Sequence, residues 1–110
     1  MSKSDSAETG ILALIFNATT WTNMATSTGT ANLTVALHTA DPLANEATGT
    51  QLTSEISYTG YARVSVARTS GGWTVAGNSV TPVAAITFGQ MTAGAGGTVT
   101  HWSVGTGTSN

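Results

Sequence analysis

The stretch Tyr61-Ala-Arg-Val-Ser-Val-Ala-Arg68 alternates apolar and polar side chains and is the clearest strand signal in the chain. Successive side chains of a strand point to opposite faces, so this alternation predicts one buried and one solvent-facing side. The inner face would carry Ala62, Val64 and Val66, and the outer face Tyr61, Arg63 and Ser65. A β-rich fold is therefore the first expectation.

Shorter segments of the same kind lie on both sides of this stretch. Strands are predicted over residues 33–38, 56–58, 73–76, 79–83, 84–88 and 98–104. Gly77-Asn78 is typical of a two-residue hairpin turn, and residues 93–97 are predicted to form a Gly/Ala loop. Many short strands separated by turn signals indicate an all-β, mainly antiparallel fold, namely a small jelly-roll-like β-sandwich or partial barrel.

One short helix is predicted ahead of the strands. Ile11, Leu14, Ile15 and Ala18 recur at helical spacing, and Thr9 can cap a helix over residues 10–18. A strand over residues 11–16 is the alternative. We expect a flexible N-terminal arm over residues 1–8, a single β domain over residues 9–105 and a frayed tail over residues 106–110.

The composition excludes several classes of protein. Of 110 residues 22 are Thr, and only 7% are charged, with Lys3, Arg63 and Arg68 as the basic residues. Three positive charges are too few to neutralise a phosphate backbone or to hold an anionic membrane surface, so neither nucleic acid nor a membrane is an expected partner. The lack of Cys excludes disulfides and thiolate sites. A neutral, Thr-rich surface favours a protein that functions within an assembly.

The polar residues form no recognisable catalytic or metal-binding pattern. His38 and Asp41 lie three residues apart across a turn, where a local hydrogen bond between them is favoured over a shared metal ion. The chain has no G-x-S-x-G nucleophile motif, and Asp41, Glu46 and Glu55 fall in one loop rather than across a cleft. We therefore expect no catalytic, cofactor-binding or metal-binding residues and no enzyme activity.

The remaining candidate functional residues are those that would contact other subunits. Trp73 and Trp102 are expected in the core, whereas Trp21 lies in a polar loop and is a candidate for binding a partner. Three environments are open to Arg63 and Arg68: solvent, a loop carboxylate or contact with another subunit. The predicted interface residues are Trp21, Met24, Tyr61, Arg63, Arg68 and Thr100.

Five segments together resemble a family of small tailed-phage structural proteins. They are Leu33-Thr-Val-Ala-Leu-His-Thr-Ala-Asp-Pro42, Ser54-Glu-Ile-Ser-Tyr-Thr-Gly-Tyr-Ala-Arg-Val-Ser-Val66, Gly72-Trp-Thr-Val75, Ala85-Ile-Thr-Phe88 and Val99-Thr-His-Trp-Ser-Val-Gly105. The similarity covers residues 33–105. The members with a better defined role are capsid decoration, or cement, proteins of short-tailed phages, such as the epsilon-type Salmonella podoviruses and the Bordetella podovirus.

This resemblance implies a jelly-roll-like fold placed as dimers on the outer surface of an icosahedral capsid. The implied function is non-enzymatic stapling of neighbouring major-capsid subunits against internal DNA pressure, with the major capsid protein and a second copy as partners. Longer relatives continue past the Trp-Ser-Val-Gly segment, so an unpaired strand edge is expected here. The alternatives are a tail or fibre-associated structural module, and a host-surface carbohydrate-binding module that stacks sugars on Trp21 or Tyr61.

Overall fold

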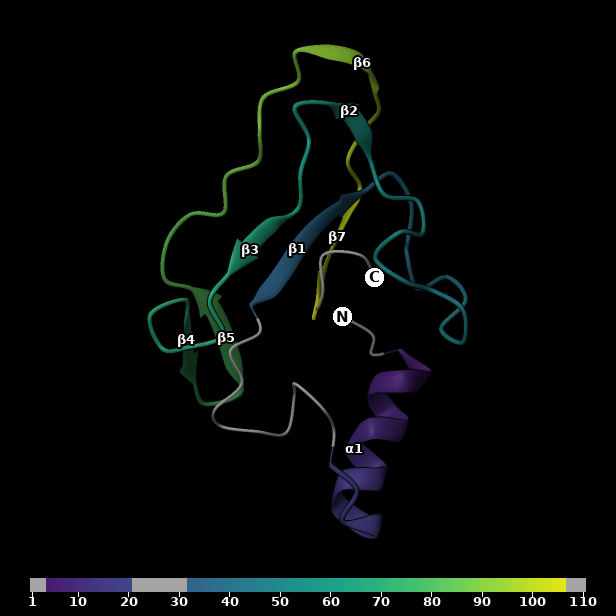
Figure 1. The fold of residues 1–110 in the computed structure, drawn as a ribbon, viewed down its shortest axis with the longest axis vertical. Helices are drawn as coiled ribbons and strands as arrows, with labels where there is room; N and C mark the ends of the chain where they lie inside the picture. Colours follow the sequence, from purple (N-terminus) through teal and green to yellow (C-terminus); the bar gives the residue numbers. More distant parts are fainter. Residues whose placement is uncertain (1–3, 21–31, 107–110) are drawn as a thin grey trace.

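The computed structural model describes residues 4–20 and 32–106 (Figure 1). Two predicted interface residues, Trp21 and Met24, lie outside these described residues. The elements are α1 (Asp5–Asn17), β1 (Leu33–His38), β2 (Ser57–Thr59), β3 (Val64–Val66), β4 (Trp73–Ala76), β5 (Ser79–Pro82), β6 (Ala93–Gly96) and β7 (His101–Gly105). No helix in these described parts is long and apolar enough to cross a bilayer.

Strand β1 is the centre of the fold. It lies between β3 and β7 in a three-stranded antiparallel sheet, with Val35 opposite Val64 on one side and Val104 on the other. Val35 and Ala36 are buried although their side chains point to opposite faces of the strand. At these two positions β1 is shielded from water on both faces, and its two neighbours form the edges of this sheet.

Two smaller antiparallel sheets complete the β structure. Strands β4 and β5 form a hairpin joined by Gly77-Asn78, where Gly77 takes a φ of 60°, as the predicted turn requires. Strand β2 pairs with β6 with an irregular register between Ser57 and Thr59. The mainly antiparallel, small β-sandwich-like fold with one short helix, as predicted from the sequence, is confirmed.

Several predicted boundaries are wrong. Residues 61–68 were expected to form one strand, but only Val64–Val66 do, as β3. Glycine and proline account for two further differences. Residues 93–97 were expected as a loop, but 93–96 form β6, in which Gly94 and Gly96 take positive φ values and accommodate the irregular pairing with β2. Residues 84–88, after Pro82, form no strand. Instead the Phe88 ring stacks on Tyr61, with ring centres 6.1 Å apart.

Helix α1 begins earlier than the Thr9 cap predicted. Ser4 is the N-cap, and its hydroxyl oxygen accepts a hydrogen bond from the Ala7 amide at 3.3 Å. Asp5 and Glu8 lie in the first turn, where negative charge is favourable at the positive end of the helix dipole. Residues 5–8, which were expected in a flexible arm, are therefore helical. Residues 11–16 are helical rather than extended.

Gly72 provides a test of close backbone packing in the turn before β4. A Cβ atom at Gly72 would collide with the Ala67 carbonyl oxygen, whereas one at Gly71 would meet only the Thr69 hydroxyl at 3.5 Å. We expect Gly72→Ala to lower the free energy of unfolding by about 1–3 kcal/mol, because overpacking forces the backbone to shift. The neighbouring control Gly71→Ala should leave it unchanged or slightly raised. Urea denaturation followed by circular dichroism measures both, and equal losses would contradict this description of the turn.

Candidate interaction surface

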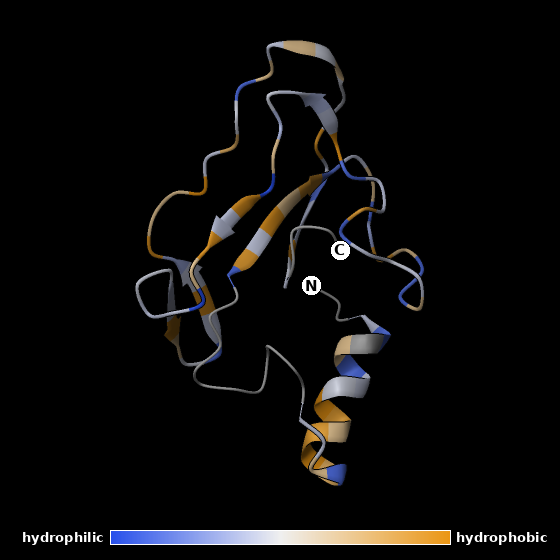
Figure 2. Cartoon of the chain, in the orientation of Figure 1, coloured by the Kyte–Doolittle hydropathy of each residue, from blue (hydrophilic) through white to orange (hydrophobic). Residues whose placement is uncertain are grey.

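The two faces of the central sheet differ in chemistry. Figure 2 shows strongly hydrophobic positions of β1 alternating with paler, less hydrophobic ones. Thr34 and His38 are buried on the side covered by the loop that contains Gln51, whereas Leu33, Val35 and Leu37 line a hollow on the other side. We call the first side the polar cluster and the second the apolar hollow.

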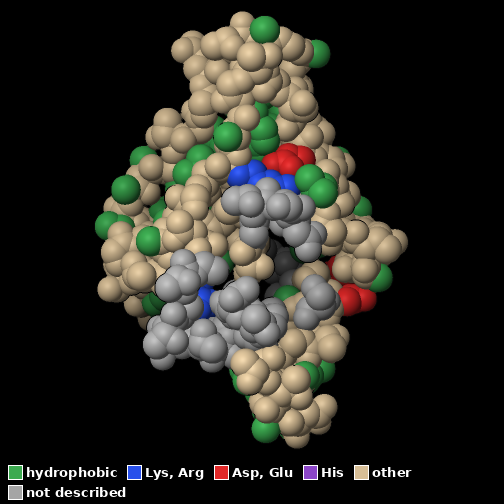
Figure 3. All heavy atoms as spheres, viewed as in Figure 1, with side chains coloured by type: hydrophobic (Ala, Val, Ile, Leu, Met, Phe, Trp, Pro, Cys, Tyr) green, Lys and Arg blue, Asp and Glu red, His purple; other side chains and the backbone are tan. Residues whose placement is uncertain are grey.

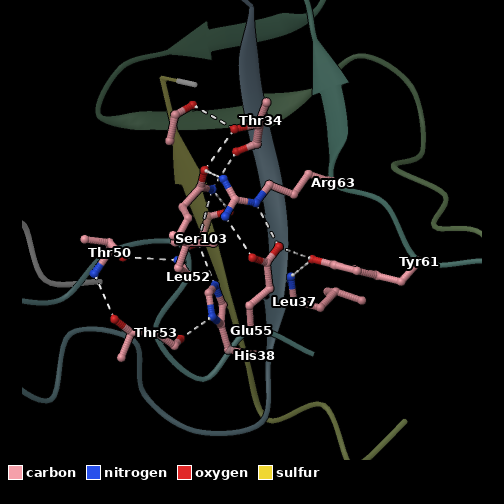
Figure 4. Close-up of polar contacts among 12 residues, drawn as sticks. Thr34, Leu37, His38, Thr50, Leu52, Thr53, Glu55, Tyr61, Arg63 and Ser103 are labelled. Carbon is pink, nitrogen blue, oxygen red and sulfur yellow. Dashed lines mark hydrogen bonds and ion pairs between the residues drawn. The ribbon is translucent and has the colours of Figure 1, made fainter. Parts of the chain in front are cut away.

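The polar cluster contains an ion pair that is largely shielded from water. Arg63 donates from Nε and Nη2 to the two carboxylate oxygens of Glu55, both at 2.8 Å, and only 8% and 13% of these side chains are exposed (Figure 4). The Tyr61 hydroxyl donates to the same carboxylate at 2.8 Å and accepts from the Leu37 amide at 3.1 Å. The outward orientation expected for Tyr61 and Arg63 is therefore wrong, because both side chains turn to meet Glu55.

Gln51 connects this ion pair to the sheet. Its side-chain oxygen accepts from the Thr34 hydroxyl at 2.9 Å and from Arg63 Nη1 at 3.3 Å, and its nitrogen donates to the Thr34 carbonyl at 2.9 Å. The side chain also lies against Gly105, where a Cβ atom would collide with it. A loop residue thus links β1, β7 and Arg63, which directly precedes β3, and the sequence contained no signal for it.

His38 occupies the end of the cluster and is completely buried. Its Nδ1 lies 2.9 Å from the Thr53 carbonyl oxygen, and its Nε2 lies 2.7 Å from the Ser103 hydroxyl (Figure 4). A carbonyl only accepts, so Nδ1 carries the hydrogen. The expected hydrogen bond between His38 and Asp41 does not form, because the Asp41 carboxylate accepts from the Leu43 amide instead.

The His38–Ser103 pair resembles a general base next to a nucleophile, but its surroundings indicate a structural role. The Ser103 oxygen also accepts a hydrogen bond from Gln51 Nε2 at 3.2 Å, which lowers its electron density for attack. His38 has no exposed surface, so a substrate could not reach the side of the ring that would take the proton. This arrangement holds β1, β7 and the covering loop together.

The ion pair shifts the acid–base equilibria of its members. Hydrogen bonds from Arg63 hold the pKa of the Glu55 carboxyl below its ordinary value, although burial opposes this shift. Burial raises the pKa of Tyr61 to about 12, and the hydrogen bond to Glu55 adds to the increase. The carboxylate is therefore the charged partner and the tyrosine the neutral hydrogen-bond donor at neutral pH.

The lowered pKa of Glu55 predicts a loss of stability in acid. A carboxyl whose pKa is lower in the folded than in the unfolded chain stabilises the fold above its unfolded value, and this contribution disappears as pH falls through the folded pKa. We expect Glu55→Gln to be less stable than the wild type at pH 7, and this difference to decrease as the pH is lowered from 7 into the acid range below the ordinary value of 4.5. Urea denaturation across this range measures the difference, and a gap of constant size would contradict the assignment.

The apolar hollow is a concave surface on the described residues with a volume of about 1060 Å³. Its walls come from β1, the β4–β5 hairpin, β7 and the segment around Ile86 and Phe88. The lining is almost entirely apolar, and Arg68 contributes its one formal charge. The side chains are Leu33, Val35, Leu37, Arg68, Thr69, Ser70, Trp73, Val75, Val80, Pro82, Ile86, Phe88, Val99, Thr100, His101, Trp102 and Val104.

Both tryptophans expected in the core line this hollow instead. Trp73 is half-buried and Trp102 is exposed, and Val75 on the same wall has 75% of its surface accessible. The core contains few fully buried apolar residues among those described, namely Val35, Ala36 and Ile56. The side chains that would form a second core layer therefore face an open concavity.

Helix α1 adds a second exposed apolar surface. Its segment Gly10-Ile-Leu-Ala-Leu-Ile-Phe16 has no polar side chain, and Leu12, Leu14, Ile15 and Phe16 are all exposed, the last to 77%. Figure 1 shows the helix apart from the sheets, and it packs against none of the described strands. Complete burial of one such side chain contributes about 1.5–3 kcal/mol, so these positions favour contact with another surface.

The structure separates the predicted interface residues into two groups. Arg68 and Thr100 line the apolar hollow, whereas Tyr61 and Arg63 lie in the polar cluster on the other face. Thr100 precedes β7 rather than lying within it, and its amide donates to the His38 carbonyl at 2.9 Å. Figure 3 shows few charged side chains on the visible face, with the basic and acidic ones near its middle side by side.

Comparison with known proteins gives one match. A family model described as Podophage GP4 fiber I protein gp80 matches residues 2–109, which is almost the whole chain. No curated protein and no solved structure matches the chain.

Proposed function

We propose that this chain, which belongs to the podophage GP4 fiber I protein gp80 family, is a fibre-associated structural subunit of a podophage virion. Membership of this family makes the chain a phage structural protein and a component of the virion. The family description supports the fibre location, and the match includes α1 as well as the β domain. The proposed activity is binding to other protein subunits rather than chemistry.

The observation that carries this proposal is the apolar hollow. Its exposed Val75 and Trp102 side chains favour binding to another protein, because contiguous exposed apolar surface often lies at interaction sites. The polar cluster supports the same interpretation, since its hydrogen bonds and ion pair connect β1, β3 and β7 behind the hollow. The polar cluster thus stiffens one face of the sheet, while the apolar hollow on the other face remains available for binding another protein.

Stapling of the capsid surface is a second candidate location. It is favoured by the resemblance of residues 33–105 to cement proteins of short-tailed phages. A staple would bury the same apolar surface across the seam between major-capsid subunits, and many symmetric copies would add their small contributions. Carbohydrate binding through Tyr61 has less support, because its ring lies against Tyr58 and Phe88 and its hydroxyl is fully engaged.

Labelling of purified particles distinguishes the two locations. A peptide tag after Asn110, detected with gold-conjugated antibody in electron micrographs, should appear at the tail of each particle if the fibre proposal is correct. Label over the whole shell would contradict the fibre location and support stapling of the capsid surface instead. Absence of both label and protein from particles would contradict a role in the virion.

The stapling candidate makes a separate prediction about mechanical stability. Particles that lack the protein should lose DNA at a lower temperature, or after a milder osmotic shock, than complete particles if the chain bridges capsid subunits. If the chain belongs to the fibre, the shells should be equally stable with and without it while adsorption to cells decreases. DNA release measured by a fluorescent dye during heating provides the comparison.

A further inference from the structure

We propose that the apolar hollow of one copy is occupied by helix α1 of a second copy, and that two copies exchange their helices reciprocally. This inference deepens the proposed function by naming the first partner of that surface. The exchange concerns free protein in solution. Its failure would therefore leave the proposed location in the virion standing, and failure of that location would leave the exchange standing.

Helix α1 requires a surface on which to dock. It has 13 residues, and isolated helices of this length are only marginally stable in water, because most helical stability in proteins comes from packing. Its second half is apolar around the entire circumference, which is typical of a helix that is buried. No α1 residue lines its own hollow, and α1 packs against none of the described strands.

The hollow fits a helix better than it fits a small molecule. Its volume of about 1060 Å³ is larger than the roughly 300–1,000 Å³ of ligand pockets, and the one formal charge in its lining is that of Arg68. A wide apolar concavity between the β4–β5 hairpin and β7 is instead suited to the side of an amphipathic or apolar helix. The exposed side chains of Leu12, Ile15 and Phe16 supply that kind of surface.

The charges of helix and hollow are complementary. Within α1 the charged residues are Asp5 and Glu8, both acidic and both in the first turn. The formal charge in the lining of the hollow is the positive Arg68. A docked helix can therefore place its acidic first turn towards Arg68 while its apolar second half fills the hollow.

The area that such an exchange buries is sufficient for a dimer. A 13-residue helix is about 20 Å long and 11 Å wide, so one side of it covers roughly 350 Å². In a reciprocal exchange each copy buries one side of its helix and a matching area of its hollow, or roughly 700 Å², close to the 800 Å² per partner of a standard interface. A twofold arrangement makes both contacts equivalent, as in most homodimers.

Substitutions on the two surfaces test the exchange. Ile15→Asp places a charge on the apolar part of α1, and Val75→Asp places one in the wall of the hollow. The matched control is Thr74→Asp, because Thr74 is exposed, adjoins Val75 in β4 and does not line the hollow. Light scattering coupled to size-exclusion chromatography should show dimers for the wild type and the control, and at least a tenfold weaker dimer for the other two variants.

Mixing the variants gives the decisive result. The Ile15→Asp chain retains an intact hollow and the Val75→Asp chain retains an intact helix, so together they should form a heterodimer with one complete contact. A wild type that stays monomeric at all concentrations, or variants that remain dimeric, would overturn the proposal. A monomeric wild type that is destabilised by Ile15→Asp would show that α1 docks in its own hollow.

Cross-linking keeps the proposal testable if Val75→Asp fails to fold. The chain has no cysteine, so a single chain carrying both Ile15→Cys and Val75→Cys reacts with a short bis-maleimide only at these positions. Reciprocal exchange predicts a band of twice the chain mass on a denaturing gel, absent from the matched Ile15→Cys, Thr74→Cys chain. A cross-link formed within a single molecule, or the same gel bands for both double-cysteine variants, would contradict reciprocal exchange.

Discussion

Replacing Arg63 with Ala is expected to lower the free energy of unfolding by about 3–5 kcal/mol, because it leaves the shielded Glu55 carboxylate without its counter-charge. The two side chains are only 8% and 13% exposed, and two hydrogen bonds of 2.8 Å join them. Exposed charges contribute little to folding, so an arginine on an outward strand face would give almost no loss. Urea denaturation at pH 7 measures the change.

A double substitution separates the cost of an unpaired charge from the cost of lost packing. Arg63→Met together with Glu55→Leu removes both charges and keeps much of the apolar volume, so the chain should recover a large part of the stability lost by Arg63→Ala. Arg68→Ala is the matched single control, since Arg68 lies outside the polar cluster and lines the hollow. Equal losses for Arg63→Ala and Arg68→Ala would contradict the importance of the ion pair.

His38 is the second position at which a large effect is expected. His38→Ala removes a completely buried ring, leaves a cavity and deprives the Thr53 carbonyl of its donor. We expect a loss of about 2–5 kcal/mol from the cavity alone, with the lost hydrogen bonds adding to it. The chain melts at a correspondingly lower temperature, which differential scanning calorimetry measures.

His101 is the natural control for this substitution. It lies directly opposite His38 in the register of β1 and β7, but its side chain is exposed. His101→Ala should change the free energy of unfolding by less than about 0.5 kcal/mol, as surface substitutions usually do. If both histidines could be replaced without effect, the proposed role of His38 in joining β1, β7 and the covering loop would be wrong.

Local alternation predicted some strands well and others poorly, since the clearest alternating stretch, residues 61–68, forms a strand only over Val64–Val66. The predicted limits of residues 33–38 and 73–76 agree with β1 and β4, and the Gly77-Asn78 turn agrees with the β4–β5 hairpin. The start of α1 was misplaced because Ser4 and Thr9 both satisfy the rules for an N-cap, although the acidic residues Asp5 and Glu8 after Ser4 favour the earlier start. The residues around Gly94 looked like a loop, since pairing with β2 depends on glycine conformations that the sequence does not specify.

The surface properties were harder to predict than the strands. Arg63 had three possible environments, and the pairing with a loop carboxylate is the one that occurs. Gln51 and Ser103 were missed because 52 positions separate them in the chain, and only the alignment of β7 with β1 brings them together. Trp73 and Trp102 were assigned to the core because a large apolar side chain favours burial. The side chain alone does not indicate whether the same chain or another protein covers it.

A virion subunit whose incorporation depends on its apolar hollow must be present in purified particles, and its amount there is the most direct measurement. Phages encoding wild-type protein, Val75→Asp or the control Thr74→Asp would be purified through a density gradient, and the chain quantified against the major capsid protein by mass spectrometry. We predict equal amounts for the wild type and Thr74→Asp, and at least a tenfold depletion for Val75→Asp. Wild-type amounts of Val75→Asp in the particles would contradict a role of the hollow in incorporation, and the absence of the chain from wild-type particles would contradict a role in the virion.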